Sequence, residues 1–395
     1  MSNQTQSAPP PASPLPVASA RMDYVDALRG GACLWVMLNH SSEIYVIPPG
    51  LQHTPLRILS NIAYLGWLGV SLFLVLSGFC LYYPLARRAE SLSEIKLDVK
   101  AFFKRRATRI LPTYYVALFI YIVALIVAAR QNGLPWDHSF SGAKDIPMHI
   151  LMLHNLRSST LGSINGAFWS LALESQLYLI FPLLVALAAR RGLRSILLVT
   201  FAIAVVWQGL AFHWLGFSTE WDVQRAQWYH ALPGRAFEFA IGMSAAALVS
   251  RPIPARLVRW SALILALLIV PATYYTARIS VFGPLLDQMW GIIFGCALIL
   301  LHGVPVRHFR GNVVLRFLTW TGVISYSLYL MHLLIFRLFP IPHANDFILS
   351  LMLLARATGA LGFALIFFIL FEQPFIRKPR KNTGLVEATV LSPAP

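Results

Sequence analysis

Charged residues are scarce in this sequence. Asp, Glu, Lys and Arg make up 12% of the 395 residues, while 57% are hydrophobic. This balance excludes an ordinary soluble domain, in which about 25% of all residues are charged. Apolar runs long enough to cross a bilayer recur along the chain instead. The sequence therefore predicts an all-α, polytopic integral membrane protein whose main partner is the lipid bilayer.

Cysteines and acidic residues are also few. The three cysteines are an odd number and all fall within apolar runs, which excludes a disulfide framework and a zinc site, so no metal is expected. Acidic residues number 16 against 32 Lys and Arg, giving a formal charge of +16. The basic residues stand in short clusters between apolar runs, which is typical of membrane topology and not of nucleic-acid binding. We also find no Gly-rich phosphate loop and no internal repeat.

Apolar length and flanking charges predict about ten transmembrane helices. They are placed at 27–47, 58–83, 107–129, 166–189, 195–215, 231–250, 260–277, 284–303, 317–337 and 348–372. With both termini in the cytoplasm, every cytoplasmic segment is basic, as the positive-inside rule requires. Residues 1–22 are expected to be a disordered Pro/Ala/Ser-rich tail, 23–380 the membrane domain and 381–395 a cytoplasmic tail.

The first apolar segment contains ionisable residues that a membrane helix normally lacks. Arg29 and His40 are eleven residues apart, close to three helical turns, so both lie on one helix face roughly 16 Å apart along the axis. An ionisable group in a bilayer-spanning helix costs at least ~2.5 kcal/mol and usually faces a protein interior or a water-filled cavity. The two residues therefore indicate the wall of a polar pocket.

The third segment carries Arg106 and Arg109 on one face at its cytoplasmic mouth. Paired guanidinium groups suit the phosphates of a nucleotide-carrying donor such as an acyl-coenzyme A. Topology signalling is the favoured explanation for Lys104 and Arg105, but Arg109 lies inside the apolar run, where a merely topological charge is costly.

Three further segments carry polar side chains. Glu174 lies below an outer rim marked by Trp169, where either an ion pair or a substrate role explains a carboxylate. Arg235 and Glu238 are spaced for a local ion pair. Ser325, Tyr329 and His332 form one polar stripe on an otherwise apolar helix, which suits a pocket lining as well as a satisfied core.

These residues predict acyl transfer. A histidine, with an ordinary pKa near 6.5, is suited to take the proton from an alcohol, so His40 is the candidate general base. No nucleophile elbow and no Cys beside a His is evident, which favours direct attack of an acceptor hydroxyl on a thioester over a covalent acyl-enzyme.

The chain resembles the acyltransferase family 3 membrane proteins over about residues 23–380. The resemblance rests on six motifs in the family's order. They are Asp26-Ala-Leu-Arg29-Gly followed by His40, Ser77-Gly-Phe79, Arg106-Ala-Thr-Arg109, Trp169-Ser-Leu-Ala-Leu-Glu174-Ser-Gln176-Leu-Tyr178, Ser325-Tyr-Ser-Leu-Tyr329-Leu-Met-His332 and Glu372-Gln-Pro.

The resemblance implies an O-acyltransferase of the bacterial inner (plasma) membrane. Acetyl-CoA, or another acyl-CoA, would be the donor and a hydroxyl of a cell-surface polysaccharide, lipopolysaccharide or related glycan the acceptor. His40 and Glu174 would be catalytic, with Glu174 orienting the acceptor, while Arg29, Arg106 and Arg109 would bind the donor. Ser175 stands where many members carry a second acid, so only Glu174 inherits that role.

Several alternatives stay open. The resemblance is to members without an extra C-terminal periplasmic domain, and some relatives acylate a small acceptor such as a macrolide or another secondary metabolite. A secondary transporter also uses intramembrane His, Arg and Glu, but it predicts broken helices and repeated halves, and the sequence shows neither convincingly.

Overall fold

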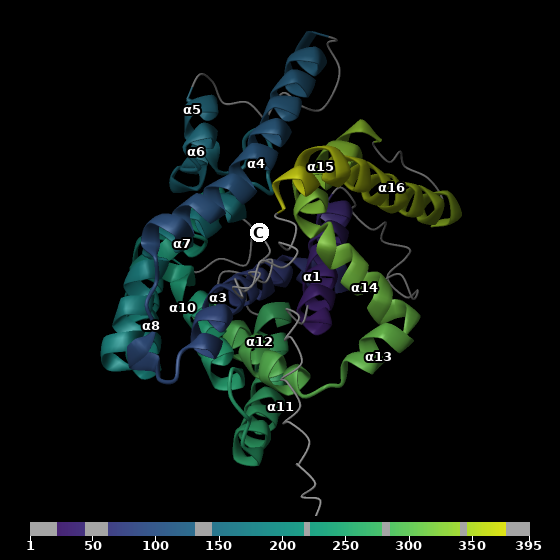
Figure 1. Ribbon diagram of the computed structural model, residues 1–395. Coiled ribbons are helices and arrows are strands. Elements are labelled where there is room, and N and C mark those ends of the chain that lie inside the picture. The colour runs from purple at the N-terminus through teal and green to yellow at the C-terminus, as the bar shows by residue number, and fades with distance from the viewer. Residues whose placement is uncertain are drawn as a thin grey trace, which may run out of the picture.

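The computed structural model describes residues 22–43, 62–130, 144–216, 222–278, 285–339 and 346–376, and every regular element in these ranges is helical (Figure 1). The predicted all-α class is therefore confirmed. The tails predicted at 1–22 and 381–395 lie outside the described residues, apart from Met22, and stay predictions.

The helices of the first half are α1 (Asp23–Glu43), η2 (Leu65–Trp67), α3 (Leu68–Arg88), η3 (Leu92–Glu94), α4 (Val99–Arg130), α5 (Asp145–Ile150), η5 (His154–Leu156), α6 (Ser158–Leu161), α7 (Trp169–Arg191) and α8 (Leu193–Leu215). Those of the second half are α9 (Val223–Tyr229), α10 (Leu232–Val249), α11 (Ala255–Arg278), α12 (Leu286–His302), α13 (Val306–Gly311), α14 (Val313–Val323), α15 (Ser325–Leu338), α16 (Asp346–Phe367), η6 (Phe368–Glu372) and η7 (Gln373–Phe375).

Within the described ranges, seven helices are long and apolar enough to cross a membrane, and an eighth span results if α14 and α15 are counted together. The chain is thus a multi-pass membrane protein. The other two predicted spans correspond to α1, which carries Asp23, Asp26 and Arg29, and to α12, which has only 17 residues. The total of ten and the cytoplasmic position of both termini stay predictions.

The ninth predicted span is not a single straight helix. Helices α14 and α15 meet at 84° around Ile324. Gly322 explains the path of α14, because a Cβ there would collide with the backbone carbonyl of Asp26, so only glycine lets α14 pack this closely on α1. The chain then turns, and α15 packs against α16. The sequence-based expectation of no clear helix break was therefore wrong at this position.

A second close helix contact joins α3 and α10. A Cβ on Gly242 of α10 would collide with the carbonyl of Val75 on α3. Small residues at such crossings are typical of membrane helices, because packing and not hydrophobic burial drives their association. The contact fixes the rotation of α3, and that rotation turns Ser77 towards α7.

The basic connecting segments gather at one end of the bundle. Arg251, after α10, donates a hydrogen bond of 2.5 Å to the carbonyl of Glu90, after α3. Arg310 of α13 pairs with Asp23 at the start of α1 at 3.0 Å. The positive-inside rule assigns these four segments to one side, and each of the two contacts joins a pair of them.

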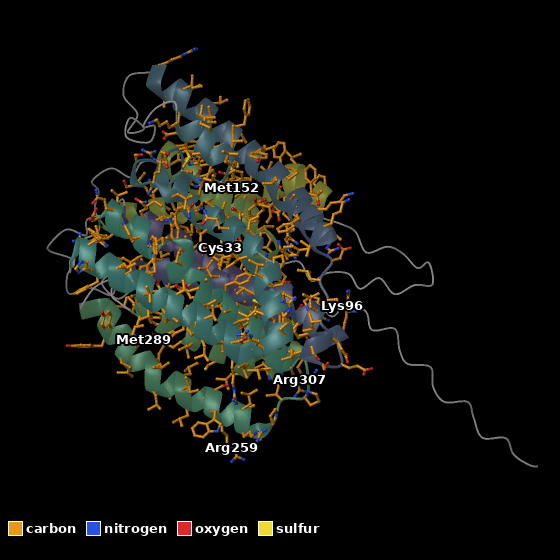
Figure 2. The ribbon with its side chains drawn as sticks, turned by 90° about the vertical axis from the view of Figure 1, so that its left-hand side faces the viewer. Cys33, Lys96, Met152, Arg259, Met289 and Arg307 are labelled. Carbon is orange, nitrogen blue, oxygen red and sulfur yellow. The ribbon has the colours of Figure 1, made fainter. Side chains whose placement is uncertain are left out.

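Helix α1 runs through the interior of the bundle, between α3, α14 and α15. Figure 2 shows Cys33 of α1 near the centre of the molecule, with Lys96 and Arg307 towards the right and Met289 towards the left. Polar side chains of α1 therefore face protein and not lipid, which explains how Arg29 can be only 3% exposed.

Candidate active site

The structure brings together two histidines that the sequence places far apart. His40 lies in the last turn of α1 and His332 in the middle of α15, and Nδ1 of His40 is 2.8 Å from Nε2 of His332. The two rings are nearly parallel, with an angle of 4° between their planes and 5.1 Å between their centroids. His332 is 1% exposed, and His40 is more accessible. We call these two residues the histidine pair.

The residues of the polar stripe predicted on α15 have two different roles. Tyr329 lies beside the histidine pair, with its ring centroid 5.8 Å from that of His332, and its hydroxyl contacts Ser170 of α7 at 2.5 Å. Ser325 instead donates to the carbonyl of Gly322 at 2.9 Å, so it stabilises the turn between α14 and α15. Ser170 was not predicted.

Three arginines that were predicted as donor ligands also come together. Arg29 of α1 and Arg106 and Arg109 of α4 all act electrostatically on Cys80 of α3. Arg29 also pairs with Asp26 on its own helix at 3.6 Å. We call Arg29, Arg106 and Arg109 the arginine cluster. Because α1 and α4 contribute to it jointly, the cluster could not have been assembled from either helix alone.

Arg106 is held by aromatic rings. Its guanidinium carbon lies 5.8 Å from the ring centroids of both Phe102 and Tyr178, a cation–π geometry. It is 8% exposed, and its Nε has no hydrogen-bond partner among the described residues. A buried donor in this state is available to a ligand such as a phosphate oxygen.

Glu174 lies between the histidine pair and the arginine cluster. Its Oε1 accepts hydrogen bonds from Ser77 of α3 at 2.6 Å and from Tyr178 at 2.5 Å. The carboxylate also lines a small cavity between α3, α7 and α15, whose wall includes Phe73 and Tyr329. The Ser77-Gly motif thus has a direct structural reason, because Ser77 binds Glu174.

A second carboxylate, Glu372, faces the arginine cluster. It ends the π-helical segment η6 and accepts hydrogen bonds from the backbone N–H and the hydroxyl of Ser327, the latter at 2.6 Å. Its charge also acts on Arg109. Extra backbone turns of this kind often occur at functional sites. The sequence signal was the Glu372-Gln-Pro motif.

Arg235 and Trp169 do not join the histidine pair. Arg235 forms a fully buried ion pair with Glu238, with Nε to Oε2 at 2.5 Å, and a further contact of 3.3 Å with Asp287 of α12. Its neighbour His230 stacks on Trp169 at 4.1 Å. The predicted Arg235–Glu238 pair is confirmed, whereas Asp287 was missed although it is an acid in an apolar segment.

A metal site would need a cluster of His, Cys, Asp or Glu side chains among the residues that the structure describes. Among them, no group of three or more His, Cys, Asp or Glu side chains is arranged to hold an ion. The arginine cluster carries the positive charge that phosphate groups attract.

Comparison with known protein families shows which family this chain belongs to. A family model described as an acyltransferase domain covers residues 22–373, nearly all of the chain. The chain belongs to this acyltransferase family. The predicted resemblance is therefore confirmed, and the chain is assigned at family level to acyltransferases that transfer groups other than amino-acyl groups.

Individual relatives are more distant. The chain is 26% identical over 289 residues to the putative peptidoglycan O-acetyltransferase YrhL of Bacillus subtilis, and 25% identical over 282 residues to the peptidoglycan O-acetyltransferase OatA of Listeria monocytogenes. Each match covers 68% of this chain and 44% of the relative. It is also 29% identical over 170 residues to the acyltransferase MdmB of Streptomyces mycarofaciens, covering 43% of this chain and 40% of that relative. The chain thus matches less than half the length of each. No solved structure matches it.

Proposed function

We propose that this protein is an O-acetyltransferase of the bacterial inner membrane. It would move an acetyl group from acetyl-CoA to a hydroxyl group of a cell-surface polysaccharide, lipopolysaccharide or related glycan. Membership of the acyltransferase family supports acyl transfer, and two relatives that are named as peptidoglycan O-acetyltransferases support a glycan hydroxyl as the acceptor.

The observation that carries the proposal is the histidine pair. His40 is hydrogen bonded through Nδ1, and its Nε2 has no hydrogen-bond partner among the described residues. Nε2 of His40 takes the proton of the acceptor hydroxyl as that oxygen attacks the carbonyl carbon of the thioester. The new C–O bond forms, the C–S bond breaks, and the imidazolium returns its proton to the departing coenzyme A thiolate.

The arginine cluster supports the choice of donor. It lies towards the basic end of the bundle, about 16 Å along α1 from His40. Acetyl-CoA carries its phosphates at one end of a long flexible arm and its thioester at the other. One molecule of acetyl-CoA could therefore bind with its phosphates at the arginine cluster and its thioester at His40. Glu174, between these two positions, would orient the acceptor.

Two alternatives make different predictions. Acylation of a small acceptor uses the same histidine and the same donor and differs only in the product. One observation supports a secondary transporter, because α14 and α15 form the kind of broken span that such proteins use. Family membership favours acyl transfer over transport.

The test compares surface glycans from a strain that lacks this gene. The strain is complemented with the wild type, His40→Ala or, as a matched control, His213→Ala, which alters an exposed histidine at the end of α8. We expect mass spectrometry and proton NMR to detect O-acetyl groups with the wild type and the control. We expect His40→Ala to lose at least about 100-fold, because general bases contribute about 10²–10⁴ in rate.

The comparison requires equal amounts of each protein in the membrane. An acetylated glycan at normal level with His40→Ala contradicts the assigned base. An unacetylated glycan with the wild type rules out the glycan acceptor. Purified protein incubated with labelled acetyl-CoA and small hydroxyl compounds then decides whether any acyl transfer occurs.

A further inference from the structure

The hydrogen bonds around His332 determine which of its nitrogens carries a proton. Nδ1 of His332 lies 3.1 Å from the backbone carbonyl oxygen of Leu328. A carbonyl oxygen can only accept, so Nδ1 must be the donor. In a neutral imidazole, the other nitrogen then carries a lone pair. Nε2 of His332 is therefore a hydrogen-bond acceptor.

The acceptor role of His332 in turn determines which nitrogen of His40 carries a proton. Its Nδ1 lies 2.8 Å from Nε2 of His332, and one of these two nitrogens must donate. Since Nε2 of His332 accepts, Nδ1 of His40 donates and carries the proton. Nε2 of His40 is then left with the lone pair that a general base needs. The chain of hydrogen bonds thus runs from His40 to His332 to the carbonyl of Leu328.

The opposite arrangement requires a charged His332. A doubly protonated His332 would donate to His40 from Nε2 and would place the free lone pair of His40 on Nδ1 instead. His332 is only 1% exposed, and Arg337 already places a positive charge at the end of the same helix. A buried cation without a counter-ion is costly, so the neutral arrangement is favoured.

Neighbouring groups keep the ring of His332 in this orientation. The rings of Tyr329 and Phe336 lie on either side in sequence, each with its centroid 5.8 Å from that of His332. Helix α15 itself is fixed at its end by Arg356, which donates to the carbonyls of Phe336 and Phe339 at 2.6 Å. The acceptor nitrogen is therefore held by packing and not by solvent.

We propose that His332 is a positioning residue that holds His40 in the tautomer with Nε2 unprotonated and that accepts from the His40 imidazolium during transfer. The proposal rests on the proposed function of His40 as the base. A carboxylate fills the corresponding position in Ser-His-Asp enzymes. Here a neutral imidazole does so, and no proton moves to His332 at any step, because its Nε2 only accepts.

Two substitutions at one position test this role. His332→Leu removes the acceptor, and His332→Gln replaces it with an amide oxygen. We expect His332→Leu to lower kcat for acetyl transfer by about 10²–10³-fold, with KM for acetyl-CoA within about twofold, because tautomer control and not donor binding is lost. We expect His332→Gln to recover at least tenfold of this loss. Met331→Leu, a volume-conserving change in the same turn, is the control and should keep wild-type kinetics.

A spectroscopic measurement makes the test independent of activity. In wild-type protein labelled with ¹⁵N-histidine and embedded in bilayers, solid-state NMR at pH 7.5 should find Nδ1 of His40 protonated and Nε2 unprotonated. In His332→Leu, the signal of the Nε2-protonated tautomer should appear.

Three results would overturn the proposal. They are a wild-type kcat in His332→Leu, equal losses in the Leu and Gln variants, and a protonated Nε2 of His40 in the wild type. If neither variant reaches the membrane, the wild-type spectrum decides alone. If the wild type transfers no acetyl group, the proposed function fails while the spectrum still tests the His40–His332 hydrogen bond.

Discussion

At the scale of single residues, Glu174 and Arg109 are held in different ways. One oxygen of Glu174 accepts two hydrogen bonds, from Ser77 and Tyr178, so this carboxylate is already fixed in orientation. Arg109 forms no hydrogen bond and no salt bridge with the described residues, and the main charges acting on it are those of Arg29 and Glu372. Arg109 therefore keeps its full capacity to hold a phosphate group.

Arg109→Ala should weaken donor binding. A hydrogen bond to a charged group contributes about 1.5–3 kcal/mol, which corresponds to about a 10- to 100-fold rise in KM for acetyl-CoA. The expected change in kcat is much smaller, because the thioester and His40 lie farther along the bundle. Steady-state kinetics with purified protein in bilayers measure both constants.

The control for this substitution is Lys104→Ala. Lys104 lies on the same helix but is exposed, and its KM should stay within about twofold of the wild type. A fall in kcat with unchanged KM in Arg109→Ala would contradict a role in donor binding and would place Arg109 at the reacting atoms instead.

At the scale of elements, glycines decide which helices can touch. We expect Gly242→Ala in α10 to destabilise the protein by about 1–3 kcal/mol or more, because the new methyl group meets the rigid backbone carbonyl of Val75 on α3. The expected result is a lower apparent melting temperature, measured on detergent-solubilised protein. Acetyl transfer should fall as well, since α3 carries Ser77.

Gly209→Ala is the matched control on α8. A Cβ at Gly209 meets no atom within 4 Å, so only the gain in helix propensity remains. Equal melting temperatures for the two variants would show that α3 and α10 do not pack as closely as described.

Some features of the helices could be predicted from the sequence, and others could not. Apolar length predicted the long helices, and the spacing of Arg106 and Arg109 predicted their common face, because both signals are local in the chain. The break at Ile324 was not predicted, because the apolar pattern continues across it, and the close contact of Gly322 with α1 beside it is not local in the chain. The partnership of His40 with His332 spans 292 residues, and no local pattern encodes a contact of that kind.

At the scale of the whole molecule, polar groups are divided between the two ends and the interior. The basic segments meet at one end, and the arginine cluster lies towards it. The segment between α4 and α7 packs back onto the bundle elsewhere, where Tyr114 donates to the carbonyl of His149 at 3.0 Å (Figure 1). This segment contains a second pair of histidines, His149 and His154, whose rings stack at 3.9 Å.

The stacked histidines should make the whole protein sensitive to acid. Both are fully buried, and burial lowers the pKa of His154 to about 3, with the neighbouring His149 adding to the effect. Burial also lowers the pKa of His149. Below about pH 6.5 the unfolded chain therefore binds protons that the folded chain cannot, so stability is complete above that pH and declines as the pH falls towards 3.

The expected loss from His154 is about 1.4 kcal/mol per pH unit over this window, and His149 adds to it in the same direction. Apparent melting temperatures of detergent-solubilised protein at pH 7.5 and 5.0 measure it. His154→Leu should reduce the difference between the two temperatures, because a leucine fills the stacked position without titrating. His308→Leu, which changes an exposed histidine on α13, should leave the difference as in the wild type. Equal acid sensitivity in all three proteins would mean that other groups dominate the response, and the packing of this segment against α4 would then not limit stability at low pH.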